Sequence, residues 1–200
     1  MALTIPLSDH ETAFEAALAA IMAGGIVLYP TDTLYGIGCD ATNAASVKKL
    51  RALKRRDAEK PLSILVSDFA MLSRYCKLTP EQEKIVQELL PGPYTFILPL
   101  SRRLPVSDTF EVGVRVPEHA FMRAVAKEAG VPIVTTSANL SGEKDASELS
   151  GVSREILEGC DLAIEGRKCK YAMGSTVLDL VRMKVIRKGA VREGDKIEFE

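Results

Sequence analysis

The chain has 200 residues and a mass of 21.7 kDa, the size of one domain. Apolar residues make up 46% and charged residues 26%, an ordinary balance for a globular protein, so fibrous and low-complexity classes are excluded. The formal net charge is −1, from 26 basic and 27 acidic residues. The chain as a whole is therefore no polyelectrolyte, and an anion-binding site must come from local clustering.

Targeting signals are absent from the sequence. No apolar run reaches the ~18 residues that a membrane span needs. The N-terminal residues lack the basic and long apolar regions of a signal peptide. The cysteines are scattered, without a C-x-x-C pair, at Cys39, Cys76, Cys160 and Cys169. We therefore expect a cytoplasmic protein with free thiols, no membrane association, and neither a zinc site nor a disulfide framework.

Helices and strands are predicted to alternate along the first two thirds of the chain. A capping box at Ser8 and Glu11 predicts a helix that ends before Gly24. Further helices are predicted at 43–53, 67–75, 79–90, 118–128 and 153–157. Strands are predicted at 26–29, 62–66, 94–100, 112–116, 132–136, 162–164, 176–181 and 184–187. Because the last third is rich in strands, the pattern favours one α/β domain over residues 1–200 with a mixed sheet.

A basic cluster lies between Lys48 and Lys60. It holds seven basic and two acidic residues, a local charge of +5 on a chain of net −1. One interpretation is a solvated helix end, where cations are favoured by the helix dipole. The other is an anion site.

Four polar segments lie next to predicted strands, at 30–36, 54–56 with Lys60, 135–142 and 174–176. Open α/β sheets build their ligand crevices at such positions. The segments offer cations with many hydroxyl and amide donors, which suit a polyanion. Neither standard phosphate-binding loop is present, so a nucleotide must be bound by another route.

Other chemistries are less well supported. Ser137, Ser141 and Ser175 lack the G-x-S-x-G context, and only His10 and His119 could act as a base, which disfavours a serine hydrolase. Cys39 has no evident histidine partner and is interpreted as a small buried apolar residue. A protein metal site is not expected, but Mg²⁺ carried in by phosphates needs few protein ligands.

Several motifs are similar to those of one known family. The segment Tyr29–Gly38 (YPTDTLYGIG) resembles the opening motif of the YrdC/TsaC family. Lys54-Arg55-Arg56 with Ser137-Ala138-Asn139 matches that family's K-x-R…S-x-N signature. Further matches follow in family order at 60–62, 91–95, 113–117, 174–177 and 187–190. The resemblance thus covers nearly the whole chain.

The resemblance implies an L-threonylcarbamoyladenylate synthase of the short, single-domain form. Such nucleotidyltransferases convert L-threonine, bicarbonate or CO₂, and ATP with Mg²⁺ into threonylcarbamoyl-AMP and pyrophosphate. The product serves N6-threonylcarbamoyladenosine formation at tRNA position 37. The implied fold is an open, twisted α/β sheet with a basic concave face. Implied partners include tRNA or double-stranded RNA and a downstream tRNA threonylcarbamoyl-transferase machinery.

The resemblance also implies roles for individual residues. The expected catalytic residues are Lys54, Arg56, Ser137 and Asn139. The expected ATP-binding residues are Lys54, Arg56, Lys60, Ser137, Asn139, Ser141, Ser175 and Arg187. The residues expected around threonine and bicarbonate are Thr31, Thr33, Tyr35, Thr95 and Arg115. No obligatory side-chain base is apparent.

The K-x-R element departs from the family pattern at two positions. Arg55 and Asp57 stand where family members often have Pro or Gly, so Arg55 is left outside the site and is expected to face solvent or RNA. Retention of Lys54 favours the synthase branch over YciO-type paralogues.

Two other functions compete with this interpretation. A non-catalytic module for tRNA or double-stranded RNA would use the basic face for phosphate contacts and would tolerate loss of Asn139. A carbamoyl transferase of HypF type is disfavoured, because that function normally belongs to a much longer chain with zinc-finger cysteines. Taken singly, the site residues also have structural interpretations: Thr31 and Thr33 as a strand end, Asn139 as a turn residue and Arg115 as an edge residue.

Overall fold

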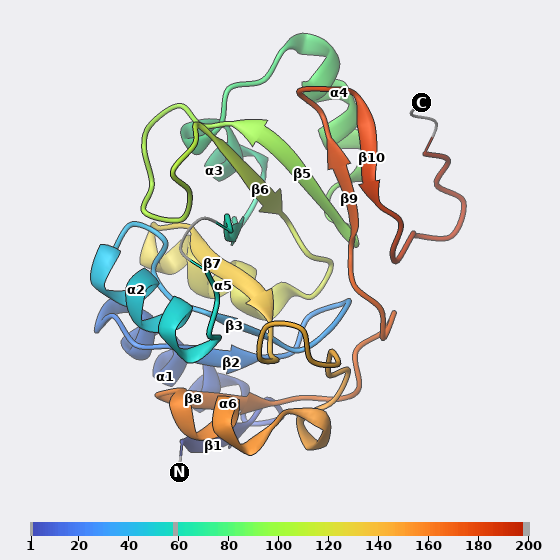
Figure 1. The fold of residues 1–200 in the computed structure, drawn as a ribbon. Helices are drawn as coiled ribbons and strands as arrows, with labels where there is room; N and C mark the ends of the chain where they lie inside the picture. The colour runs from blue at the N-terminus through green and yellow to red at the C-terminus, as the bar shows by residue number, and fades with distance from the viewer. Residues whose placement is uncertain (1, 58–59, 198–200) are drawn as a thin grey trace.

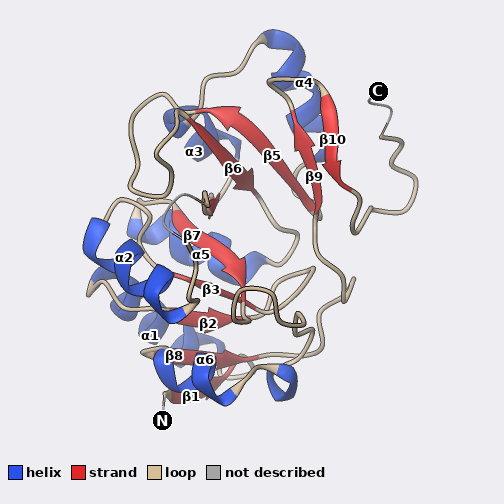
Figure 2. Cartoon of the chain, in the orientation of Figure 1, coloured by secondary structure: helices blue, strands red, loops and turns tan. Residues whose placement is uncertain are grey.

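The computed structural model describes residues 2–57 and 60–197 (Figures 1 and 2). Within them, ten strands form one sheet in the order β1-β8-β2-β3-β7-β4-β6-β5-β9-β10. The strands are β1 (Leu3–Pro6), β2 (Val27–Tyr29), β3 (Gly36–Gly38), β4 (Ser63–Leu65), β5 (Tyr94–Pro99), β6 (Glu111–Arg115), β7 (Ile133–Ser137), β8 (Leu162–Glu165), β9 (Thr176–Asp179) and β10 (Lys184–Arg187). Among these strands, four pairs are parallel (β1–β8, β2–β8, β4–β6, β5–β9), and the other five are antiparallel (β2–β3, β3–β7, β4–β7, β5–β6, β9–β10). The predicted open, mixed α/β sheet is confirmed, whereas the basic concave face stays a prediction.

Helices cover the sheet (Figure 1). They are α1 (His10–Met22), α2 (Ala44–Leu53), α3 (Phe69–Tyr75), α4 (Pro80–Leu89), α5 (Ala120–Ala129) and α6 (Arg154–Gly159), with a 3₁₀ turn at Leu149–Gly151. Helix α1 contacts β1, β2, β8 and α5, and it buries Ala13, Ala17 and Ile21 at a spacing of four, the inward stripe of an amphipathic helix. None of the helices described between residues 2 and 197 combines the length and apolarity that crossing a membrane requires.

Helix α4 begins where its local sequence predicts. The Thr79 hydroxyl accepts a hydrogen bond from the Gln82 amide at 3.3 Å, and the Gln82 side chain accepts one from the Thr79 amide at 2.9 Å. The capping box predicted at Ser8 is wrong. Helix α1 starts one residue later, with Asp9 at the N-cap and no side-chain cap, because the chain leaving β1 turns through an Asp9 amide bond to the Pro6 carbonyl.

Strands β1 and β3 were not predicted. Strand β1 is a four-residue edge strand in which only Ile5 is buried, too short for a clear sequence pattern. It pairs with β8, whose Leu162 lies opposite Leu3 although the two are 159 residues apart in the chain. Strand β3 consists of Gly36, Ile37 and Gly38, and glycine disfavours strands. A Cβ on Gly38 would lie 2.2 Å from the Val134 carbonyl oxygen, so close backbone approach requires the glycine.

The strand register brings the polar segments to the middle of the sheet. Gly36 pairs with Ser137, and Ser63 pairs with Thr135, which joins β3, β7 and β4. Residues 30–35 connect β2 to β3 at the same place. Strands β6, β5, β9 and β10 continue the sheet beyond β4, so both halves of the sheet contribute to one site.

Candidate active site

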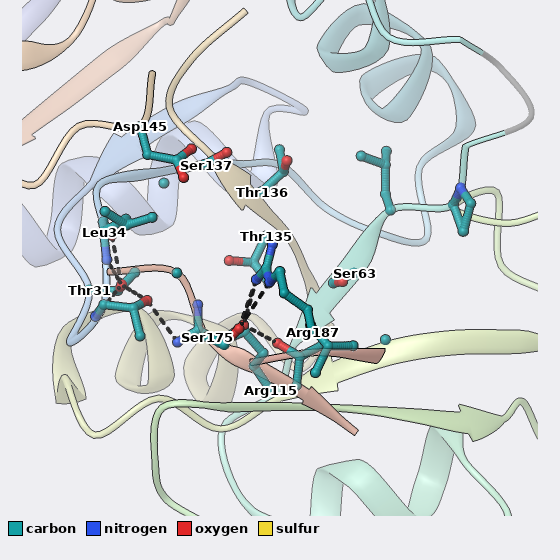
Figure 3. A pocket seen from close by; sticks show the side chains of 18 of the residues that line it. Thr31, Leu34, Ser63, Arg115, Thr135, Thr136, Ser137, Asp145, Ser175 and Arg187 are labelled. Atoms are coloured by element: carbon teal, nitrogen blue, oxygen red, sulfur yellow. Dashed lines mark hydrogen bonds between the residues drawn. The ribbon is translucent and has the colours of Figure 1, made fainter. Parts of the chain in front are cut away.

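A cavity of about 290 Å³ lies over the centre of the sheet (Figure 3). Nine of the thirteen predicted site residues line it: Thr31, Thr33, Tyr35, Arg56, Thr95, Arg115, Ser137, Ser175 and Arg187. Lining residues that the sequence analysis did not assign include Ser63, Thr135, Thr136 and Asp145. The cavity walls therefore combine three guanidinium groups with many hydroxyls, as an anionic ligand requires.

A second cavity, of about 680 Å³, lies on the other side of residues 31–32. It is lined by Asp32, His119 and residues 165–168 among others, and of the predicted site residues only Thr31 reaches it. The candidate active site is therefore the smaller cavity.

The segment after β2 folds around the Thr31 hydroxyl. This hydroxyl donates to the Leu34 carbonyl at 2.7 Å and accepts from the amides of Thr33 and Leu34 at 3.1 and 3.2 Å. Such a turn is typical of threonine, and it fixes the loop that forms one cavity wall. The Tyr35 hydroxyl donates a hydrogen bond to the Gly166 carbonyl and accepts one from the Gly166 amide. Because this hydroxyl is already paired, other atoms of Tyr35 line the cavity.

Asp32 and Arg115 form a buried ion pair beneath this loop. The Arg115 Nη2 donates to Asp32 Oδ1 and to the Thr33 hydroxyl, both at 3.0 Å, and Asp32 Oδ2 accepts from the Glu118 amide at 3.0 Å. Burial lowers the pKa of Arg115, but arginine stays charged at neutral pH. Arg115 is thus held by a carboxylate at the cavity wall and is not a free edge residue.

Two of the guanidinium groups at the cavity retain donors without a partner. Within the described residues, the buried Nε atoms of Arg56 and Arg115 make no hydrogen bond. Arg56 Nη2 donates to the Pro61 carbonyl at 2.8 Å, which anchors the group. Burial lowers the pKa of Arg56 as well, and the neighbouring Arg51 adds to the effect. Both donors are buried from solvent without a partner in the described part of the chain, which is uncommon in folded proteins.

The opposite wall is built by β5, β9 and β10. The hydroxyls of Thr95 and Ser175 lie 2.8 Å apart, and Arg187 Nη2 donates to the Ser175 hydroxyl at 3.2 Å and to its carbonyl at 2.9 Å (Figure 3). Gly189 lets this wall close, because a Cβ there would lie 2.2 Å from the Gly174 carbonyl oxygen. The two sequence motifs at 174–177 and 187–190 are therefore in direct contact.

Lys54 supports the turn after β7 from below and is not among the lining residues. Its ammonium donates to the carbonyls of Ser137 and Asn139 and to the Asn139 side chain. The Ser137 hydroxyl donates to Asn139 Oδ1 at 2.6 Å, and the Ser141 amide donates to the Lys54 carbonyl at 3.1 Å. Burial lowers the pKa of Lys54 to about 8. The structure thus places Lys54 and Asn139 as parts of one hydrogen-bonded turn.

The remaining predicted residues lie apart from the cavity lining. Ser141 is exposed beside the turn, and Lys60 is exposed and pairs with Asp57 at 2.8 Å. Arg55 pairs with Glu155 at 2.8 Å, so its side chain already has an anionic partner. Of the Lys48–Lys60 cluster, Arg56 is the member that reaches the cavity, so the cluster is not a single binding surface.

Fold and site together define a mixed α/β protein with a central cavity lined by guanidinium and hydroxyl groups. A family model described as "Telomere recombination" (Sua5_yciO_yrdC) matches residues 19–189. The chain belongs to this Sua5/YciO/YrdC family, and the resemblance to YrdC/TsaC proteins is confirmed.

Relatives span much of the chain. A Methanocaldococcus jannaschii protein is 37% identical over 188 residues, covering 93% of this chain and 87% of its own. The Mus musculus threonylcarbamoyl-AMP synthase is 36% identical, covering 93% of this chain and 70% of the mouse protein.

Solved structures share the fold. P. abyssi Sua5 in complex with L-threonine superposes with a TM-score of 0.87 at 28% identity, over 94% of this chain and 57% of the Sua5 chain. This chain therefore spans less than two thirds of that protein. E. coli YciO, with a TM-score of 0.85 over 97% of this chain and 98% of its own, is 22% identical and shares the fold alone.

Proposed function

We propose that the chain is an L-threonylcarbamoyladenylate synthase that serves threonylcarbamoyladenosine formation in tRNA. The observation that carries the proposal is the cavity in which Arg56, Arg115 and Arg187 meet a wall of hydroxyl groups. The similarity to a mouse protein of that name and to a Sua5 structure holding L-threonine supports the same activity.

The proposed reaction has two steps. The threonine amine attacks CO₂, or the carbon of bicarbonate with loss of water, forms an N–C bond and gives up a proton, which yields a carbamate. A carbamate oxygen then attacks the α-phosphorus of ATP, an O–P bond forms, and pyrophosphate leaves. Negative charge moves onto phosphate oxygens, so fixed cations and oriented donors lower the barrier.

The chain's residues are proposed to act by position and charge. Arg56 and Arg187 bind phosphates from opposite walls of the cavity. Arg115, oriented by Asp32, binds the threonine carboxylate or bicarbonate beside the 31–35 loop. Mg²⁺ enters the cavity bound to ATP. The hydroxyls of Ser137 and Ser175 lie beside the phosphates of ATP. Lys54 and Asn139 act by holding the turn that carries Ser137.

Partners and compartment are also proposals. Threonylcarbamoyl-AMP is a mixed anhydride that must reach a tRNA-modifying transferase soon after it forms, and the cytoplasm is the compartment we propose for both. The non-catalytic RNA-binding alternative has little support from the basic cluster, whose members make separate contacts.

Pyrophosphate release tests the proposal. We expect release from ATP and Mg²⁺ only when L-threonine and bicarbonate are both present, and mass spectrometry should detect the adenylate. Asn139→Ala should keep the fold while ATP affinity or turnover falls. A folded protein without turnover, whose RNA affinity survives Asn139→Ala, would favour the RNA-binding module instead.

A further inference from the structure

The cavity contains a single carboxylate. Within the described residues, Asp145 is the only acidic side chain among those that line it, opposite Arg56, Arg115 and Arg187. Its side chain is exposed, and its negative charge raises the pKa of the buried Lys54 ammonium, which partly offsets the effect of burial on that group. The guanidinium groups match phosphate, carboxylate and bicarbonate, whereas the exposed carboxylate of Asp145 can pair with a cationic group on the ligand.

The loop that carries Asp145 is anchored on both sides of this residue. The Asn139 side chain donates to the Glu143 carbonyl at 2.6 Å. The Tyr35 amide donates to the Ala146 carbonyl at 2.8 Å, and Ala146 itself is buried. The buried turn of Lys54 and Asn139 therefore also fixes where Asp145 stands, and the Tyr35 bond ties the loop to the 31–35 wall. The position of Asp145 is set by the fold although its side chain is exposed.

We propose that Asp145 binds the ammonium group of the amino-acid substrate, an inference that rests on the proposed function. In Figure 3 Asp145 lies near Ser137 and Leu34 on one side of the site, and Arg115 lies on the other side. An amino-acid zwitterion between these groups would place its carboxylate on Arg115 and its ammonium on Asp145. Mg²⁺ carried in by the ATP phosphates is the alternative occupant, because it needs few protein ligands, and the test below distinguishes it from the ammonium group.

The test compares Asp145→Asn with Glu148→Gln, which removes an exposed charge from the same loop outside the cavity lining. Isothermal titration measures the affinity for L-threonine, for the analogue with a hydroxyl in place of the amine, and for ATP with and without Mg²⁺. Asp145→Asn should raise the Kd for L-threonine about tenfold or more, the effect of losing a hydrogen bond between charged groups. The Kd for the hydroxyl analogue should stay unchanged, and Glu148→Gln should bind like the parent protein.

Each other result overturns the inference in a recognisable way. Unchanged threonine affinity in Asp145→Asn, in a parent protein that makes the adenylate, removes the inference and leaves the proposed function intact. A selective loss of Mg²⁺-dependent ATP affinity would identify Asp145 as a metal ligand instead. A folded parent protein that neither binds L-threonine nor makes the adenylate would remove the proposed function, and the inference with it.

Discussion

Asp32 is the residue on which the position of Arg115 depends. The Asp32 side chain is 2% exposed and that of Arg115 11%, so the pair is shielded from water. Asp32→Asn should lower the free energy of unfolding by about 3–5 kcal/mol, because it leaves a guanidinium buried without its counter-charge. Urea unfolding followed by circular dichroism would measure the loss.

The matched control for this variant is Asp57→Asn. Asp57 also pairs with a cation, Lys60, but both side chains are more than 60% exposed. Water screens such a pair, so the unfolding midpoint of Asp57→Asn should equal that of the parent protein. If both variants lost the same free energy of unfolding, the buried Asp32–Arg115 pair would stabilise the fold no more than an exposed pair does.

The lowered pKa of Lys54 predicts that stability and ATP affinity depend on pH. Burial lowers its pKa from 10.5 to about 8, so between these values the unfolded chain binds a proton that the folded chain has released. This group alone therefore makes the free energy of unfolding rise as the pH increases from about 8 to about 10.5. Over the same window the turn at Ser137 and Asn139 loses its ammonium donor, so ATP affinity should fall.

Lys54→Met tests whether the Lys54 ammonium is the group that makes ATP affinity depend on pH. If Lys54 acts through the turn, the variant should bind ATP weakly at pH 7 and show no further decline from pH 7 to 9.5, whereas the parent protein declines. Isothermal titration at several pH values would measure both profiles. Parallel profiles in the two proteins would contradict this role for Lys54.

At the scale of elements, β3 depends on close backbone approach to β7. A Cβ on Gly38 would meet the Val134 carbonyl at 2.2 Å and the Ile133 side chain at 2.8 Å, and the backbone atom cannot rotate away. Gly38→Ala should therefore cost about 1–3 kcal/mol of unfolding free energy. Because Gly36 pairs with Ser137, displacement of β3 should also reduce substrate affinity.

Gly151→Ala is the control for Gly38→Ala. Its added Cβ would make ordinary contacts, the nearest 3.5 Å from the Ala146 Cβ. Thermal unfolding and pyrophosphate release should then match the parent protein. A Gly38→Ala variant as stable as Gly151→Ala would show that the two strands can separate without loss.

The elements that sequence reasoning found have their causes nearby in the chain. The capping box of Thr79 and Gln82 is complete within four residues, and it correctly predicted the start of α4. Strand β1 and the glycine-rich β3 exist because distant strands pair with them, and no local pattern reports such pairing. The same distinction explains Ser8, whose local capping signal was overridden by the turn out of β1.

In the candidate active site, too, sequence reasoning missed what depends on contacts between distant parts of the chain. Nine of the residues predicted from motif similarity line the cavity. The same similarity assigned Lys54 directly to phosphates, whereas in the structure its ammonium binds the turn at 137–139. The sequence around Lys54 does not report this contact, because the turn lies more than 80 residues further along the chain. Asp145 carried no signal at all: its loop is exposed, and its place at the cavity depends on bonds from Asn139 and Tyr35. The density of basic residues between Lys48 and Lys60 suggested one anion-binding surface, but in the structure members of this cluster form ion pairs with different acidic residues.

At the scale of the whole molecule, the cavity draws its walls from both halves of the sheet. Thr31 and residues 33–36 come from the connection between β2 and β3 and the start of β3, and Ser137 ends β7. Arg115 and Arg187 come from β6 and β10, and Ser175 lies directly before β9. A ligand that contacts all of them should join the halves and stabilise the native state. At a hundredfold excess over Kd the gain is about 2.7 kcal/mol, which for a chain of this length raises Tm by about 5–11 °C.

Differential scanning calorimetry with ATP and L-threonine would measure this shift, and two arginine variants test its origin. Arg187→Gln removes a guanidinium from the β10 wall and should abolish most of the shift caused by ATP. Arg154→Gln removes a charge from the surface of α6, where the side chain is 85% exposed, and should keep the full shift. Because both variants change the net charge equally, a general anion effect would lower the two shifts alike. That result would place ATP outside the cavity, whereas a selective loss in Arg187→Gln requires a ligand that reaches across the sheet.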